Sequence, residues 1–142
     1  GQSVLARRAL HLGEDAEVHA RSAVRLLGSF ALWLPLAQAP LMYALIAKSQ
    51  PAAALEVAAQ GLALLGQLGC VGFLEVELRL AISESFYAAG DVQRAHVELQ
   101  ETLRQIALRA ERITDPRWKA SYLQRNLYSV RAQQLAERWQ VR

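Results

Sequence analysis

The stretch ISESFYAAGDVQRAHVELQETL, residues 82–103, decides the fold of this chain. Apolar residues recur at helical spacing on both sides of Gly90 and Asp91. The Gly-Asp pair supplies a turn residue followed by a side chain that can cap the next helix. The stretch therefore predicts two helices joined by a tight turn, with Phe86 on the first helix and the small Ala95 on the second.

The pattern around Ala95 occurs at two earlier places in the chain. A small residue is followed four positions later by Ala or Leu, and three positions after that by another small residue. The three copies are Ala16/Ala20/Ala23, Ala54/Ala58/Gly61 and Ala95/Leu99/Thr102. They are about forty residues apart, a period typical of helical-repeat arrays. Such helix pairs bury their apolar faces only by stacking, so the array offers an extended binding surface rather than a pocket for chemistry.

Composition and periodicity agree with a helical array. The chain has 142 residues, of which 53% are hydrophobic and 7% aromatic, and no segment alternates with period two. We expect an all-α fold, a right-handed α–α superhelix forming a single domain over 1–142. About three helix pairs are expected over 2–27, 30–66 and 71–112, with capping helices over 116–140.

The pair over 71–112 resembles a tetratricopeptide repeat. In that family a bulky residue precedes a Gly-Asp turn and a small residue follows, and Phe86, Gly90, Asp91 and Ala95 occupy these places. In the preceding pair Ser49-Gln50-Pro51 replaces the Gly-Asp turn. The resemblance implies a solenoid of the tetratricopeptide type.

The tail, residues 112–139, reads RITDPRWKASYLQRNLYSVRAQQLAERW. It resembles the segment that closes tetratricopeptide-like regions in large bacterial signalling proteins, where an ATPase or Ser/Thr kinase domain precedes the repeats. The matching residues are Ile113, Asp115, Pro116, Tyr122, Leu123, Arg131, Leu135, Ala136 and Trp139. The resemblance implies that the chain is the C-terminal piece of a longer, cytoplasmic bacterial regulator.

The tail should close the core at its end of the array. Asp115 is suited to cap a helix that starts at Pro116. That helix should turn Trp118, Tyr122 and Leu123 onto the helix before it, and a last helix near 128–140 should add Leu135 and Trp139.

The basic residues are concentrated after Gly90. Up to that residue there are six basic and seven acidic residues, and after it ten basic and six acidic. The later arginines alternate with glutamates, as on a solvated helix face, and we therefore expect no nucleic-acid partner. The alternative is that Phe86–Ala95 is the turn of a DNA-reading helix-turn-helix. The long flanking helices and the upstream repeats speak against it.

Residues 26–47 carry no charge over about the length of a bilayer span. Pro35 and Pro40 interrupt this stretch, and Ser29 and Gln38 add polarity. We therefore expect a buried repeat helix and no membrane association.

Residue patterns that carry chemistry are missing from the sequence. There is no Gly-rich phosphate loop, no kinase loop and no Gly-x-Ser-x-Gly elbow. Cys70 has no second cysteine, and His11 and His19 lack the spacing of metal ligands. We expect no catalytic residue, cofactor or metal site, and any ATPase or kinase activity would belong to another domain of the longer protein.

The sequence therefore predicts a non-enzymatic module that binds a protein or peptide. Because the first helix of each pair lines the concave face of such arrays, the candidate contact residues are Gln38, Tyr43, Glu77, Arg79 and Glu84. Two other functions stay open: a DNA-binding regulator domain, and a peptide or small-molecule sensor that controls a linked ATPase or kinase. The apolar N-terminal helices, with Val4 and Leu5, suggest a homodimer.

Overall fold

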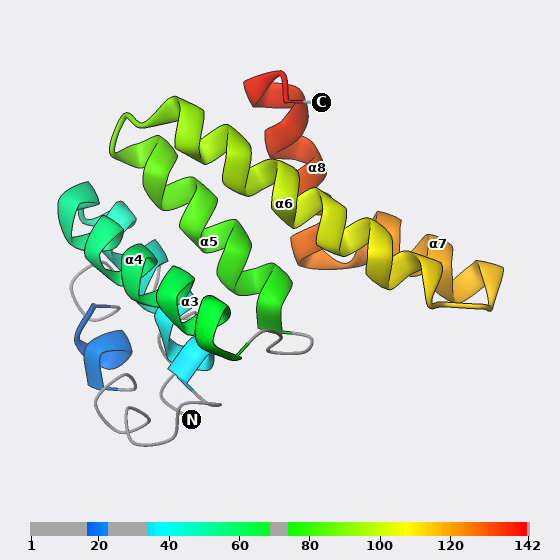
Figure 1. Ribbon diagram of the computed structural model, residues 1–142, viewed down its shortest axis with the longest axis horizontal. Helices are drawn as coiled ribbons and strands as arrows, with labels where there is room; N and C mark the ends of the chain where they lie inside the picture. Colours follow the sequence, from blue (N-terminus) through cyan, green and yellow to red (C-terminus); the bar gives the residue numbers. More distant parts are fainter. Residues whose placement is uncertain (1–16, 23–33, 69–73, 142) are drawn as a thin grey trace.

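A computed structural model describes residues 17–22, 34–68 and 74–141, and every regular element in these ranges is an α-helix. Residues 17–22 are helical. The later helices are α3 (Leu34–Ala47), α4 (Pro51–Leu68), α5 (Leu74–Ala88), α6 (Val92–Glu111), α7 (Pro116–Arg125) and α8 (Leu127–Trp139). In Figure 1, α5 and α6 cross the centre as an antiparallel pair, with α3 and α4 on one side and α7 and α8 on the other. The prediction of an all-α fold is confirmed for these residues.

The predicted turns lie where the sequence indicates. Gly90 has a φ of 88°, in the left-handed region that glycine adopts at little cost. Asp91 then caps α6 by accepting a hydrogen bond from the backbone N–H of Arg94 at 3.1 Å. In the other turn Ser49 takes the left-handed conformation and Pro51 begins α4, where its missing N–H costs nothing.

The first core lies between α3, α4 and α5. Its buried side chains include Met42, Leu45, Ala58 and Ile82. The small residues of the repeated pattern lie where these helices cross. A Cβ added to Gly61 would be 3.3 Å from Ile82 Cδ1, closer than side chains normally pack.

The second core lies between α5, α6 and α8. Its buried side chains include Leu80, Leu99, Leu135 and Trp139, and Phe86 packs against both cores. The indole of Trp139 stacks on the Tyr87 ring with centroids 4.3 Å apart and planes 6° apart. This stack fastens the end of α8 to the end of α5.

Helix α5 is the centre of the structure, because it contacts α3, α4, α6 and α8. The expected pairs over 30–66 and 71–112 correspond to α3 with α4 and to α5 with α6. Most of the pair expected over 2–27 lies outside the described residues. Val4, Leu5 and Cys70 also lie outside the described residues, and the homodimer that the N-terminal helices suggested stays a prediction.

The tail forms two helices. Asp115 caps α7 as predicted, accepting from the N–H of Arg117 at 2.8 Å. Asn126 then takes an extended backbone conformation and caps α8, accepting from the N–H of Tyr128 at 3.0 Å. Asn126 thus breaks the helix and lets α8 pack against α5 and α6, while α7 contacts α6 and α8.

One expectation for the tail is wrong. Tyr122 and Leu123 pack against the second core, and Leu135 and Trp139 are buried in it, but Trp118 is 73% exposed. Trp118 lies in the first turn of α7 and stays exposed, whereas Tyr122, one turn further along the same side, packs against the second core. Helical spacing placed Trp118 on this side of the helix, but it did not determine how far along α7 the second core extends.

Among the described helices, none has both the length and the hydropathy that a bilayer span requires. The charge-free stretch 26–47 contributes α3, whose residues 37–42 and 44–45 are buried. This part of the stretch forms a core helix.

Candidate functional site

The five candidate contact residues occupy different environments. Gln38 is fully buried, and Glu77 is 6% exposed. Arg79 lies on the side of α5 near α6, where its Nε is 3.3 Å from Glu75 Oε2. Tyr43 and Glu84 contact each other directly through a hydrogen bond.

Tyr43 and Glu84 form a polar link with a third residue, Arg131. The Tyr43 hydroxyl donates to Glu84 Oε2 at 2.6 Å. An Arg131 guanidinium N–H donates to Glu84 Oε1 at 2.5 Å. The Glu84 carboxylate therefore uses both oxygens, one toward α3 and one toward α8. We call this set the Tyr43–Glu84–Arg131 link.

Burial and charge shift the pKa values in this link. Burial raises the pKa of Tyr43 well above its ordinary value, and the negative charge of Glu84 raises it further. The hydrogen bond to Glu84 also raises the pKa of Arg131. Tyr43 thus stays protonated as a donor, and Arg131 stays charged.

The link joins three helices that lie side by side. α5 contacts α3 on one side and α8 on the other, and we call α3, α5 and α8 the first-helix row. α3 and α5 are the first helices of their pairs, and α8 lies beside α5. The link joins side chains from distant parts of the chain, and most of the other side chains of α3 and α5 are buried.

Sequence reasoning missed Arg131 as a member of this site. Periodicity places residues on one face of one helix, but it does not indicate which helix packs beside it. Two features of the sequence point to Arg131 as a site residue. It belongs to the tail motif, and few acidic residues lie near it in the sequence. Between Arg112 and Ala136 there is one acidic residue, Asp115.

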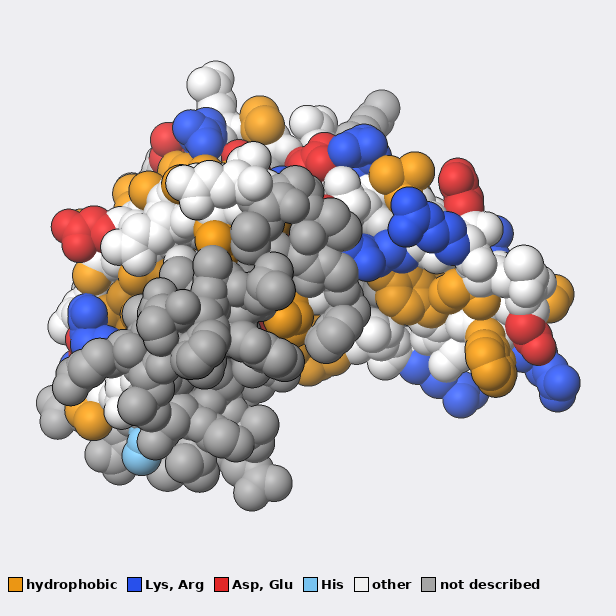
Figure 2. Space-filling model, turned by 60° about the horizontal axis from the view of Figure 1, so that its bottom comes forward, with side chains coloured by type: hydrophobic (Ala, Val, Ile, Leu, Met, Phe, Trp, Pro, Cys, Tyr) orange, Lys and Arg blue, Asp and Glu red, His pale blue; other side chains and the backbone are white. Residues whose placement is uncertain are grey.

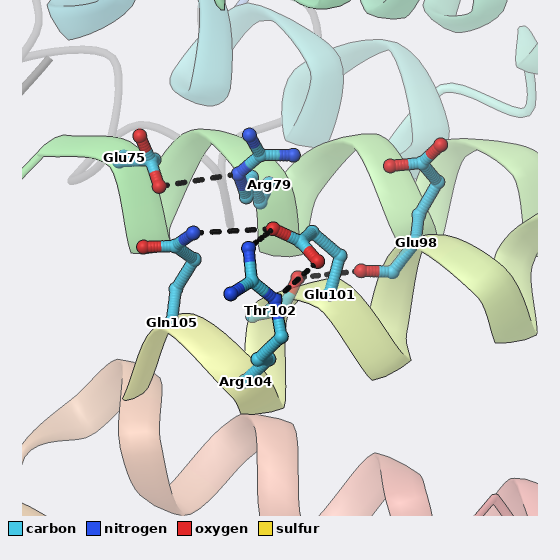
Figure 3. Close-up of polar contacts among 7 residues, drawn as sticks. All are labelled: Glu75, Arg79, Glu98, Glu101, Thr102, Arg104 and Gln105. Atoms are coloured by element: carbon cyan, nitrogen blue, oxygen red, sulfur yellow. Dashed lines mark hydrogen bonds and ion pairs between the residues drawn. The ribbon is translucent and has the colours of Figure 1, made fainter. Parts of the chain in front are cut away.

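A second polar cluster lies between α5 and α6 (Figure 3). Arg104 donates to both carboxylate oxygens of Glu101, at 2.8 and 2.6 Å. These bonds lower the pKa of Glu101 to about 2, helped by a hydrogen bond from Gln105. Arg79 of α5 lowers the pKa of Glu101 a little further through its positive charge, and the ion pairs and hydrogen bonds of the cluster lie within α5 or within α6.

Two arginines of α6 that a DNA-reading helix would use already contact other side chains of α5 or α6. Arg104 pairs with Glu101. Arg94 is 3.4 Å from Glu98, and its guanidinium lies 4.6 Å from the centroid of the Phe86 ring. Phosphate binding by these two arginines would have to compete with contacts inside the chain.

No three His, Cys, Asp or Glu side chains within residues 17–22, 34–68 and 74–141 come together as metal ligands would. Comparison of the chain with protein-family models, with curated proteins and with solved structures gave no match.

Proposed function

We propose that this chain is a non-enzymatic protein-interaction module, the scaffold part of a cytoplasmic bacterial signalling or transcriptional regulator. Its helix pairs form a right-handed, tetratricopeptide-like superhelix. The partner is a protein or peptide that lies across the first-helix row.

One observation carries this proposal. The row sets α3, α5 and α8 side by side, and the Tyr43–Glu84–Arg131 link fixes their spacing across the face. An extended, rigid face of several helices suits a long polypeptide, because binding then costs little ordering of the scaffold. Of the candidate residues, Tyr43 and Glu84 belong to the link that fixes the row, and Arg131 is its most exposed member, with 41% of its side chain exposed against 11% for Glu84.

The two other functions predict different ligands. A DNA-binding domain needs unpaired cations on the helix that follows the turn, and Arg94 and Arg104 of α6 are engaged with carboxylates. A sensor domain needs a small ligand that changes the stability of the folded chain. The three functions can therefore be separated by ligand class.

The test presents all three classes to the full chain. We expect selection from a displayed library of random peptides to yield binders whose affinity changes when Arg131 is replaced by alanine. We expect duplex DNA to bind no more tightly at low salt than at high salt, and metabolite mixtures to leave the melting temperature unchanged. Salt-dependent DNA binding, or a melting shift with a metabolite and no peptide binder, would contradict the proposal.

A further inference from the structure

Helix α7 carries a second surface that the first-helix row does not include. Every residue of α7 is at least partly exposed. Trp118 is 73% exposed, and Leu127, which begins α8 just after the Asn126 break, is 72% exposed. These are the two most exposed large apolar side chains in the described part of the chain, and exposed apolar patches rimmed by polar residues mark interaction sites.

Most of the charges around these two residues are positive, and the two acidic residues near them are Glu111 and Asp115. The cations at this end of the chain are Arg112, Arg117, Lys119 and Arg125, all exposed. Within the part of the chain that the structure describes, none of the four forms an ion pair. Figure 2 shows hydrophobic side chains among Lys and Arg side chains, with Asp and Glu side chains between them, at the end of the molecule that α7 forms. We call these six residues the α7 surface.

Four other arginines of the described chain are paired with carboxylates. Arg79, Arg94, Arg104 and Arg131 each lie within 4.0 Å of a carboxylate of their own chain, at 2.5 to 3.4 Å. Of the two acidic residues beside the α7 surface, Asp115 uses its carboxylate to accept from backbone N–H groups at the start of α7, and Glu111, also in the described chain, forms no ion pair with the four cations. The cations of the α7 surface are therefore left for a partner.

Helical spacing places an apolar and a charged side chain on the same side of α7. Trp118 and Arg125 are seven residues apart, two turns of the helix, so they lie on the same side. Tyr122, one turn from Trp118, is partly buried against the second core, and this contact holds that side of α7 in place.

The geometry points to an acidic segment of a partner protein as the occupant of the α7 surface, with apolar side chains set on Trp118 and Leu127 and carboxylates on the four cations. This inference rests on the proposed function and adds a second contact to it. Tryptophan and arginine are the side chains that most often dominate protein interfaces. A second copy of this chain fits poorly, because its described exposed acidic residues, such as Glu56 and Glu137, are scattered rather than grouped on one helix.

Nucleic acids and anionic lipid membranes also carry many negative charges, so the test must distinguish them from an acidic protein segment. Bases stack on aromatic rings, so a nucleic-acid site would use Trp118 and the cations but gain little from the aliphatic Leu127. Two apolar side chains together favour a polypeptide that offers apolar side chains of its own.

The experiment uses the full chain and a displayed library of random peptides about fifteen residues long, enough for about four helical turns. We expect one class of enriched peptides to combine Asp or Glu with Leu, Phe or Trp. Trp118→Ala, and separately the double variant Arg117→Glu/Arg125→Glu, should each weaken these peptides about tenfold or more. Binding should also weaken as salt rises, because the exposed charges are screened.

Two control variants test whether a loss of peptide affinity is specific to the α7 surface. Val97→Ala removes an exposed apolar side chain of α6, and Arg138→Glu reverses an exposed charge at the other end of α8 from Leu127. Neither should change affinity more than about twofold, since surface changes away from a contact have small effects. Because Trp118 is mostly exposed, circular dichroism and melting of Trp118→Ala should match the parent.

The experiment distinguishes binding at the α7 surface from binding across the first-helix row. If every enriched peptide binds Trp118→Ala as well as the parent but weakens with Arg131→Ala, the α7 surface is not a docking site and the first-helix row is. If Trp118→Ala abolishes binding to a single-stranded oligonucleotide, or to vesicles of phosphatidylcholine and phosphatidylserine, and leaves peptides unaffected, the occupant is not a protein. If no peptide is enriched, both proposals fail.

Discussion

Arg131 of α8 donates a hydrogen bond to Glu84 of α5 at 2.5 Å, although the two residues are 47 positions apart. The Glu84 carboxylate also accepts from Tyr43 of α3. One side chain on the central helix therefore connects the two helices on either side of it. The tail of the chain is in this way tied to the first described helix pair.

Replacing Arg131 should show how much this connection stabilises the fold. Arg131→Ala leaves the partly buried Glu84 carboxylate without its cation, and we expect a loss of about 1–2 kcal/mol in the free energy of unfolding. Arg138→Ala, an exposed residue of the same helix, should cost less than about 0.5 kcal/mol. Urea unfolding measures both values. Equal effects of the two variants would show that the Arg131–Glu84 bond adds nothing.

Tyr43 should make the protein sensitive to alkaline pH. Its pKa is raised in the folded state above the ordinary value of 10.0, so the folded state keeps a proton that the unfolded state loses. Stability from this group is complete below about pH 10 and declines as pH rises above that value. Tyr43→Phe should remove this part of the decline. Urea unfolding of both proteins between about pH 8 and 11 tests it, and parallel curves for the two would contradict the assignment.

The sequence predicted the local elements well and the long-range contacts poorly. Gly90 with Asp91, and Asp115 with Pro116, define helix ends through conformational and capping preferences that act within a few residues. Trp118 and Gln38 were misplaced because their environments depend on which helix covers them, which periodicity does not reveal. Arg131 was missed as a site residue for the same reason. Its partner lies on a helix that the local pattern does not specify.

The small residues of the repeated pattern should resist enlargement. Ala95 and Ala54 are fully buried where helices cross, and we expect Ala95→Leu or Ala54→Leu to cost about 1–3 kcal/mol through overpacking. Ala88→Leu is the control, because Ala88 is exposed at the end of α5. Thermal melting compares the three variants. An unchanged melting temperature for Ala95→Leu would count against the close crossing of α5 and α6.

Gln38 should be a weak point of the first core. It is fully buried, and its amide nitrogen and oxygen find no hydrogen-bond partner in the described structure. An unsatisfied buried amide costs about 1–3 kcal/mol, so Gln38→Leu should raise the free energy of unfolding by a similar amount. The matched control is Gln93→Leu, at an exposed position of α6. A destabilised Gln38→Leu would mean that the amide makes bonds that stabilise the fold.

The most direct test of the central claim is hydrogen–deuterium exchange of the full chain with and without a selected peptide that still binds Trp118→Ala. A peptide lying across the first-helix row should slow amide exchange in α3, α5 and α8 together, because binding there suppresses local opening of all three helices. The account predicts this joint protection, with little change in α4. Protection confined to α4 and α6, or a selection in which no peptide binds Trp118→Ala, would contradict it.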